Sequence, residues 1–141
     1  MSDDELRVED EPRLQEIAAL EDRLYQHNVA ATGCDDGRWL AIFVRDGSGE
    51  VMAGLHGWTW GRTGFVRTLW VRDDLRQRGL GARLLAAAER EATRRGCREM
   101  QLDTHSYQAP GFYRRQGYQQ IGELPGWPGE AATRFFFRKA L

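Results

Sequence analysis

The stretch that decides the fold is Thr68–Leu85, TLWVRDDLRQRGLGARLL. It begins with an apolar, β-favouring run, Leu69-Trp70-Val71, and continues through a polar connection into a turn that contains Gly79 and Gly81. A helix is predicted next, because apolar residues recur every fourth position on one face while arginines occupy the other (Leu80, Leu84, Ala88 and Ala92; Arg83, Arg90 and Arg94). The stretch therefore predicts a strand, a glycine-bearing turn and an amphipathic helix.

The glycine-bearing turn has the features of a phosphate-binding site. Free N–H groups at the start of a helix, with the positive end of the helix dipole behind them, bind anions. Gly79 and Gly81 carry no Cβ, so ligand oxygens can approach the backbone closely. Arg72, Arg76 and Arg78 add mobile positive charge. The alternative is that the two glycines only make a tight connection from strand to helix.

Two nucleotide-binding motifs fit this turn poorly. A Walker loop would need a lysine and then a serine or threonine after its second glycine, where Ala82 and Arg83 stand. A dinucleotide fingerprint would need a third glycine at Leu84 and an acid about twenty residues later, a role that Asp103 could fill. The long connection after Val71 departs from the short turn of that motif. A nucleotide-binding domain therefore ranks third among the functions considered.

The pattern Arg76-x-x-Gly79-x-Gly81, opening a helix after Leu-Trp-Val, resembles the acyl-CoA-binding motif of the GNAT superfamily of N-acetyltransferases. A second stretch, Ala109–Tyr118 (APGFYRRQGY), is similar to the family's short helix, which carries Ala, then Phe-Tyr, then Gly-Phe/Tyr after three residues. The two motifs lie in the order and at the separation that the family uses, with one strand between them. The resemblance covers about Trp39 to Leu141 and is weak before that.

The resemblance implies an α/β (α+β) fold with a mixed, mostly antiparallel sheet, a central splayed parallel strand pair and helices on both faces. We expect a single N-acetyltransferase domain over residues 1–141, with residues 1–9 flexible. The implied reaction transfers an acetyl group from acetyl-CoA to a primary amine, of a small molecule, by direct attack in a ternary complex. The alternatives are acetylation of a protein lysine or N-terminus, and a non-catalytic acyl-CoA-binding sensor. Family habit also favours a homodimer.

The resemblance also implies which residues bind the acetyl donor. The turn would hold the pyrophosphate, and the preceding strand would hydrogen-bond the pantetheine through its backbone. Ser106 stands where many relatives carry an asparagine that faces the cofactor, although a serine in a loop can equally cap the next helix. The full set is Leu69, Trp70, Val71, Arg76, Gln77, Arg78, Gly79, Leu80, Gly81, Ala82, Ser106 and Tyr113.

Three residues are candidates for proton transfer. Tyr113 matches the family's tyrosine near the CoA sulfur, a proposed general acid, with packing against CoA as its alternative role. At pH 7 a departing thiolate needs only about 2 kcal/mol of help, whereas an alkyl amine needs about 4.6 kcal/mol to lose its proton. Many relatives carry a glutamate base where this chain has Phe65. Asp103 and His105 at the end of the next strand are the candidate bases, and a water chain to solvent is another.

Composition sets limits on the protein class. A chain of 141 residues with 41% hydrophobic residues and a net charge of −1 is typical of one ordinary soluble domain and gives no sign of a nucleic-acid surface. The charge is uneven, because residues 1–36 carry eleven acids and three arginines, a net −8, which leaves +7 for the remainder. The positive excess surrounds the predicted phosphate site and suits a polyanionic ligand. The acidic N-terminal segment favours a cationic acceptor.

The two cysteines, Cys34 and Cys97, do not have the spacing of a metal or redox motif. We expect reduced thiols, with Cys97 buried. No apolar run approaches membrane-spanning length, and the acidic N-terminus is unlike a signal peptide. The sequence therefore predicts a cytoplasmic protein without a metal, nucleic-acid or membrane partner.

The remaining elements follow from hydrophobic period and turn residues. One amphipathic helix, or two short ones, is expected from Glu11 to about Asn28, with Pro12 in its first turn. The strand that follows the central helix should run parallel to the strand before it, through a right-handed crossover. The other predicted elements are strands at 39–44 (buried), 51–60, 65–71, 99–103, 118–123 and 133–139, a hairpin turn at 46–49, a helix at 80–95, a short helix at 108–116 and a loop at 125–129.

Overall fold

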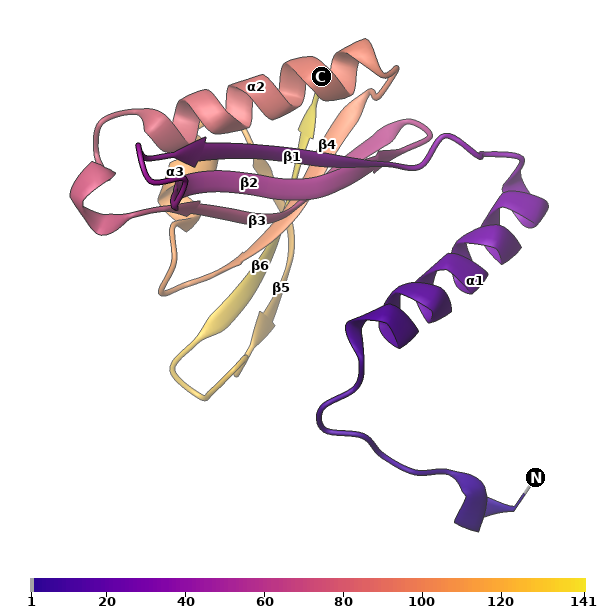
Figure 1. Cartoon of the computed structure of the whole chain (residues 1–141). Helices are drawn as coiled ribbons and strands as arrows, with labels where there is room; N and C mark the ends of the chain where they lie inside the picture. Colours follow the sequence, from indigo (N-terminus) through magenta and orange to yellow (C-terminus); the bar gives the residue numbers. More distant parts are fainter. Residues whose placement is uncertain (1) are drawn as a thin grey trace. The chain divides into compact units, whose positions relative to one another are not determined.

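The computed structural model describes residues 2–141, apart from the side chain of Asp4. The chain forms two compact units that divide after Asp35. The first unit contains the short 3₁₀ helix η1 (Asp3–Glu5) and the helix α1 (Leu14–Thr32) (Figure 1). α1 is a single helix that begins at Leu14 rather than Glu11, so Pro12 precedes it. It ends at Gly33, which adopts a φ of 74° and donates its N–H to the carbonyl of Val29 at 2.8 Å.

The second unit is built on a six-stranded sheet with the order β1-β2-β3-β4-β6-β5. Every neighbouring pair is antiparallel except β3 and β4, which are parallel. This confirms the predicted mixed, mostly antiparallel sheet. The position of β6 between β4 and β5 was not predicted, because strand order depends on pairings far apart in sequence. The strands are β1 (Arg38–Arg45), β2 (Val51–Trp60), β3 (Thr63–Val71), β4 (Glu99–His105), β5 (Gln119–Pro125) and β6 (Thr133–Ala140).

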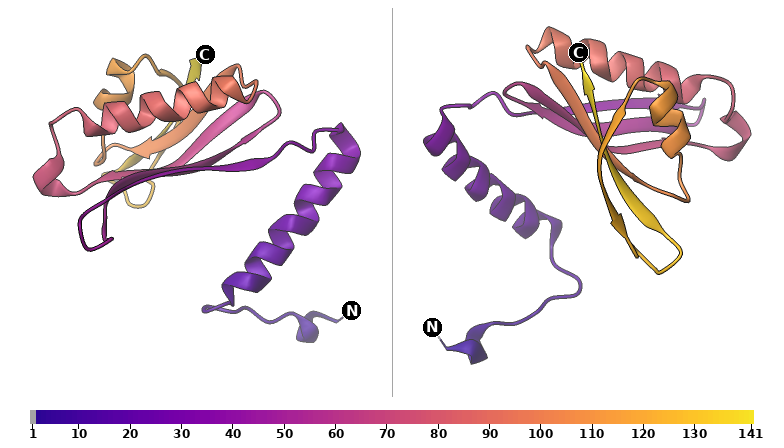
Figure 2. Two further views of the ribbon diagram at one scale, coloured as in Figure 1. Left: turned by 45° about the horizontal axis from the view of Figure 1, so that its top comes forward. Right: turned by 180° about the vertical axis from the view of Figure 1, so that it is seen from behind.

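Helix α2 (Leu80–Arg94) runs across β1, β2 and β3 (Figure 2). It ends before Gly96, which has a φ of 90°, as the sequence predicts. Its apolar residues Leu84, Leu85, Ala88 and Ala92 are buried and pack in one core with Met100 of β4 and Phe137 of β6, while Leu80 is partly buried. Each large apolar side chain buried in this way contributes about 1.5–3 kcal/mol. The other helices of this unit are the 3₁₀ helix η2 (Asp73–Leu75) and α3 (Pro110–Arg115).

Strand β1 lies at an edge of the sheet. The prediction of a buried strand is wrong, since only Leu40 is buried while Trp39 and Phe43 are exposed. An uninterrupted apolar run is compatible with burial on both faces, and composition alone does not show that one face lacks a cover. The hairpin turn after β1 is confirmed, because Asp46 Oδ1 accepts the N–H groups of Ser48 at 2.8 Å and Glu50 at 3.1 Å.

A bulge in β3 marks the level at which the sheet opens. His56 of β2 pairs with Thr68 and Gly57 pairs with Val66, so Arg67 is the extra residue. A Cβ at Gly57 would overlap the carbonyl oxygen of Phe65, which explains the glycine there. The parallel ladder between β3 and β4 also stops at Val66, opposite Leu102. Beyond this level the two strands have no ladder between them, as the predicted splay requires.

Some expectations concern groups that could bind a metal or span a membrane. Within residues 2–141, no helix is long and apolar enough to cross a membrane. The same residues contain no group of three or more His, Cys, Asp or Glu arranged to hold a metal ion. Both cysteines are free, with Cys97 buried as predicted and Cys34 exposed.

Candidate active site

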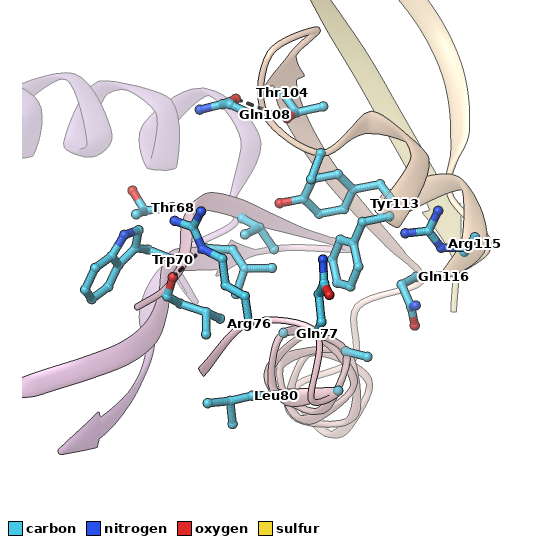
Figure 3. A pocket seen from close by; sticks show the side chains of 18 of the residues that line it. Thr68, Trp70, Arg76, Gln77, Leu80, Thr104, Gln108, Tyr113, Arg115 and Gln116 are labelled. Carbon is cyan, nitrogen blue, oxygen red and sulfur yellow. Dashed lines mark hydrogen bonds between the residues drawn. The ribbon is translucent and has the colours of Figure 1, made fainter. Parts of the chain in front are cut away.

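A cleft of about 860 Å³ opens where β3 and β4 separate (Figure 3). Its walls are the end of β3, the first turn of α2 with the loop before it, the end of β4, and α3 with the loop before it. The structure therefore brings both sequence motifs to one site. The predicted residues that line the cleft are Leu69, Trp70, Val71, Arg76, Gln77, Gly79, Leu80, Gly81, Ala82, Asp103 and Tyr113.

The start of α2 offers free backbone donors to this cleft. The first intrahelical hydrogen bond runs from Arg83 N–H to the carbonyl of Gly79 at 3.0 Å. The N–H groups of the preceding residues, Leu80, Gly81 and Ala82, donate to no other residue of the described chain. Gly79 has a φ of 77°, and a Cβ on Gly81 would lie 3.5 Å from the ring of Phe112, so larger side chains would crowd this wall. The arrangement fits a phosphate group.

The arginines near the turn are partly neutralised by neighbouring acids. Arg72 donates to Asp74 at 2.6 and 3.0 Å. Arg76 pairs with Asp73 at 2.9 Å and donates its Nε–H to the carbonyl of Val71 at 2.8 Å. These two arginines are therefore less mobile than the sequence suggests, although exposed ion pairs of this kind contribute only about 0–1 kcal/mol and can exchange for a phosphate. Arg78 is not among the cleft-lining residues.

The backbone of β3 is open on the side that faces β4. Its pairing with β2 continues to Val71, which lies opposite Ala53, whereas its ladder with β4 ends at Val66. N–H and C=O groups beyond Val66 can therefore bind an extended polar chain such as a pantetheine arm. The residues present thus fit acetyl-CoA at both its diphosphate and its arm.

Tyr113 of α3 contributes a phenol hydroxyl to the cleft. Its side chain is 8% exposed, and its ring contacts those of Tyr118 and Phe137, with centroids at 5.9 and 6.2 Å. Its hydroxyl points into the cleft (Figure 3). Burial, together with the negative charge of Asp103, raises the pKa of Tyr113 to about 12. Tyr113 therefore keeps its proton at neutral pH and has one to donate.

Asp103 adds a carboxylate to the lining of the cleft. It lines the cleft from β4 and accepts a hydrogen bond from Arg134 Nη2 of β6 at 3.0 Å. The Arg134 guanidinium also lies over the rings of Phe136 at 4.9 Å and Trp127 at 5.8 Å. The carboxylate is therefore held in one place at the end of the open part of the sheet, where a cationic amine can approach it.

His105 lies at the end of β4, within the strand rather than in a loop, and is not among the cleft-lining residues. Its ring stacks on Tyr107 with centroids at 5.2 Å, and its Nδ1 lies 3.2 Å from Oε1 of Gln108. Nε2 of His105 and Nε of its cross-strand neighbour Arg134 are buried without a hydrogen-bond partner among the described residues. Gln108, which orients this ring, was not predicted.

Ser106 has a different environment from the one that the resemblance implies. It is not among the cleft-lining residues, and its Oγ accepts the N–H of Thr133 at 3.0 Å. Its own N–H donates to the carbonyl of Thr133 at 2.8 Å, so it joins the loop to β6, while Ala109 takes the N-cap position of α3.

Several cleft residues were missed by reasoning from the sequence. Some stand inside or beside the quoted motifs, which was the available signal. Thr104 had no such signal, because its contact with Gln108 exists only once the chain has turned between β4 and α3. The missed residues that line the cleft include Thr68, Thr104, Gln108, Phe112, Arg115 and Gln116.

The family model for the acetyltransferase (GNAT) family matches residues 4–118. This chain belongs to the GNAT family. A crystal structure of an acetyltransferase from Agrobacterium tumefaciens superposes with a TM-score of 0.84 at 32% identity, covering 96% of this chain and 98% of that one. The chain is therefore an acyl-CoA N-acetyltransferase with the expected fold.

Two named relatives come from bacteria. The acetyltransferase Atu2258 of Agrobacterium fabrum is 38% identical over 116 residues, which cover 82% of this chain and 85% of the relative. The blasticidin-S acetyltransferase of Streptomyces morookaense is 43% identical over 84 residues, which cover 57% of this chain and 60% of the relative. An aminoglycoside 6'-N-acetyltransferase solved with coenzyme A shares the fold, with a TM-score of 0.63 at 18% identity over 90% of this chain and 86% of that one.

Proposed function

We propose that this protein transfers the acetyl group of acetyl-CoA to a primary amine of a small molecule, by direct attack within a ternary complex. The observation that carries the proposal is the juxtaposition of two features in one cleft. The free N–H groups at the start of α2 and the open backbone of β3 lie on one side, and the Tyr113 hydroxyl and Asp103 carboxylate lie on the other. A donor with a diphosphate and an acceptor with a positive charge would therefore meet between them.

Each wall of the cleft has a separate task on the donor side. The amides of Leu80, Gly81 and Ala82 bind the diphosphate. The backbone beyond Val66 orients the arm so that the thioester lies at the splay. Acetyl-CoA supplies that thioester, whose C–S bond breaks as a C–N bond forms. Tyr113 gives its proton to the departing sulfur, and it needs to contribute only about 2 kcal/mol at pH 7.

The acceptor side must bind an ammonium group and remove protons from it. The Asp103 carboxylate attracts the ammonium form, which predominates for alkyl amines at neutral pH. The proton that the amine loses passes to a chain of water molecules that leads to solvent, because His105, two residues further along the same strand, does not line the cleft. Solvent then returns a proton to Tyr113, so the cycle leaves the protein as it began.

A small-molecule acceptor is supported by the relatedness to blasticidin-S acetyltransferase and by a charged group at the acceptor side. The test is release of the CoA thiol by the purified protein with acetyl-CoA and a panel of amines. The panel includes blasticidin S, an aminoglycoside, spermidine, free amino acids, a lysine-containing peptide and a peptide with a free N-terminus. We expect turnover with a small amine at a kcat/KM well above that of either peptide. Faster turnover of a peptide would overturn the acceptor class, and tight acetyl-CoA binding without any turnover would indicate a sensor.

A further inference from the structure

We infer that Gln108 is a donor-binding residue, whose side-chain amide N–H groups bind a carbonyl of the pantetheine arm of acetyl-CoA. This inference deepens the function proposed above and rests on the binding of acetyl-CoA in the cleft. Gln108 lies in the loop between β4 and α3, is exposed, and lines the cleft. It adds a side chain from the β4 side to a donor site that is otherwise made of backbone groups.

Hydrogen bonds fix which way round the Gln108 amide lies. Its Oε1 accepts the backbone N–H of His105 at 2.8 Å and the hydroxyl of Thr104, a buried residue, at 3.1 Å. The same oxygen lies 3.2 Å from Nδ1 of His105. A backbone N–H can only donate, so the group that faces it must be the amide oxygen and not the nitrogen. The oxygen is therefore turned toward the end of β4.

The nitrogen of the same amide is not used by the protein. It carries two N–H donors. None of the hydrogen bonds within residues 2–141 involves this nitrogen. Figure 3 shows the Gln108 oxygen joined to Thr104 by a dashed line, while the nitrogen points away from Thr104. The protein therefore holds a donor in a fixed orientation at the wall of the cleft.

The register of the strands places this amide along the splay. The last rung of the parallel ladder joins Val66 of β3 to Leu102 of β4. Thr104 lies two residues beyond Leu102, which is about 7 Å along a strand. At a similar distance beyond Val66, residues 68 and 69 of β3 also line the cleft. Because Gln108 is bonded to Thr104, its amide lies across the splay from the first open backbone groups of β3.

An extended arm along β3 needs a hydrogen-bond donor on the β4 side. Successive groups of an extended chain point to opposite sides, so an arm that pairs with the edge of β3 also points carbonyl groups toward β4. The backbone N–H of His105 cannot bind them, because it already donates to Gln108. Gln108 thus takes up the last backbone donor of β4 and offers its own N–H groups instead. A carbonyl of the arm is the acceptor that suits them.

Titration calorimetry with CoA measures this contact without an acceptor amine. Gln108→Leu removes the donor and should raise the Kd of CoA about 3-fold to 10-fold, the usual contribution of one hydrogen bond between neutral groups. Gln108→Glu should raise it at least as much, because it keeps an oxygen for the His105 N–H but puts a second oxygen where the donor stood. An unchanged Kd in either variant would overturn the inference.

A second ligand distinguishes a contact with the arm from a change in the loop. 3′-Phospho-ADP is CoA without its pantetheine arm, so it occupies only the part of the site that binds the diphosphate and nucleotide. Its Kd should change less than about 2-fold in both Gln108 variants, as expected for a group that shares no contact with them. Equal weakening of CoA and 3′-phospho-ADP would mean that Gln108 acts only through the shape of the loop, and the inference would fail.

Thr104→Val tests how the amide is held. Without the Thr104 hydroxyl the amide can turn, so the Kd of CoA should rise about 2-fold to 3-fold in the native background and not at all in Gln108→Leu. Additive losses would contradict the inferred orientation of the amide.

The matched control is Gln120→Leu. Gln120 is exposed, lies outside the cleft, and accepts one hydrogen bond from Arg114 at 2.9 Å. Its loss should leave the Kd of both ligands unchanged, and a change equal to that of Gln108→Leu would overturn the inference. If CoA binding depends on Gln108 as expected while the native protein acetylates no amine, the inference stands and the proposed function alone fails.

Discussion

The two strand ends that flank the cleft are built in different ways. At the end of β3, one continuous stretch from Thr68 to Leu85 supplies the open backbone and the free N–H groups of α2. At the end of β4, the site depends on side chains from separate parts of the chain, including Asp103, Gln108 and Arg134. The proposed donor site is made of backbone groups and would tolerate changes of side chain, whereas the proposed acceptor side depends on the side chains themselves.

The strongest test of the donor side is to fill its backbone site. Replacing Gly79 and Gly81 together by valine should weaken acetyl-CoA binding by at least about 100-fold, about 2.7 kcal/mol, because the branched side chains block the approach to the amides. Calorimetric titration with acetyl-CoA measures this. Gly126→Val is the matched control, since Gly126 has a φ of 82°, close to the 77° of Gly79, and lies outside the cleft. Unchanged affinity in the double variant would show that the N–H groups at the start of α2 do not bind acetyl-CoA.

The acceptor side is tested with two carboxylates on one strand. Asp103 and Glu99 both lie on β4 and both pair with arginines of β6, at 3.0 and 2.6 Å, but only Asp103 lines the cleft. Asp103→Asn should lower kcat/KM for the amine by about 10-fold to 100-fold, the loss of one hydrogen bond to a charged group. Glu99→Gln should leave kcat/KM within about 2-fold, because it lies in the closed part of the sheet and an exposed pair contributes little. Equal losses in the two variants would mean that the β4–β6 ion pairs act only through stability.

Replacing Tyr113 by phenylalanine distinguishes proton donation by its hydroxyl from packing of its ring. Tyr113→Phe should lower kcat no more than about 30-fold, since protonating the thiolate needs only about 2 kcal/mol. Because the pKa of Tyr113 is raised to about 12, its phenol remains protonated below that pH. Loss of the Tyr113 proton should therefore not lower the kcat of the native protein between neutral pH and about pH 12. Full retention of kcat in the variant would exclude Tyr113 as the acid.

Tyr118→Phe is the control for Tyr113. Tyr118 is also buried, and its hydroxyl donates to Glu89 Oε1 at 3.1 Å rather than pointing into the cleft. Its loss should reduce the free energy of unfolding by about 1.5–3 kcal/mol, the usual contribution of a hydrogen bond to a charged group, with kcat unchanged. Urea denaturation and steady-state kinetics on the same preparation distinguish the two tyrosines.

The same contrast explains how much could be predicted from the sequence. The strand, glycine turn and helix of the donor side are local, so periodicity and turn residues identified them with nearly correct bounds. The bulge at Arg67 was not predictable, because it depends on the register between β2 and β3 and on the missing side chain of Gly57. The contacts of Ser106 with Thr133 and of Asp103 with Arg134 likewise depend on β6 lying beside β4. Sequence therefore identified the candidate residues of the acceptor side but not their partners.

The smallest effect is expected at Glu91, near the far end of α2 from the cleft. Hydrogen bonds from Arg94 and Arg95 lower the pKa of Glu91 from 4.5 to about 2. A carboxyl group whose pKa falls on folding stabilises the protein above its unfolded value, so this contribution is complete above pH 4.5 and is lost as the pH falls towards 2. Urea midpoints of native protein and Glu91→Gln should therefore differ at pH 6 and converge as the pH falls to about 2, while acetyl-CoA affinity at pH 7 stays the same in both. A fall in affinity would show that the C-terminal end of α2 influences the N–H groups at its start. It would contradict the view that the backbone site acts independently of the side chains around it.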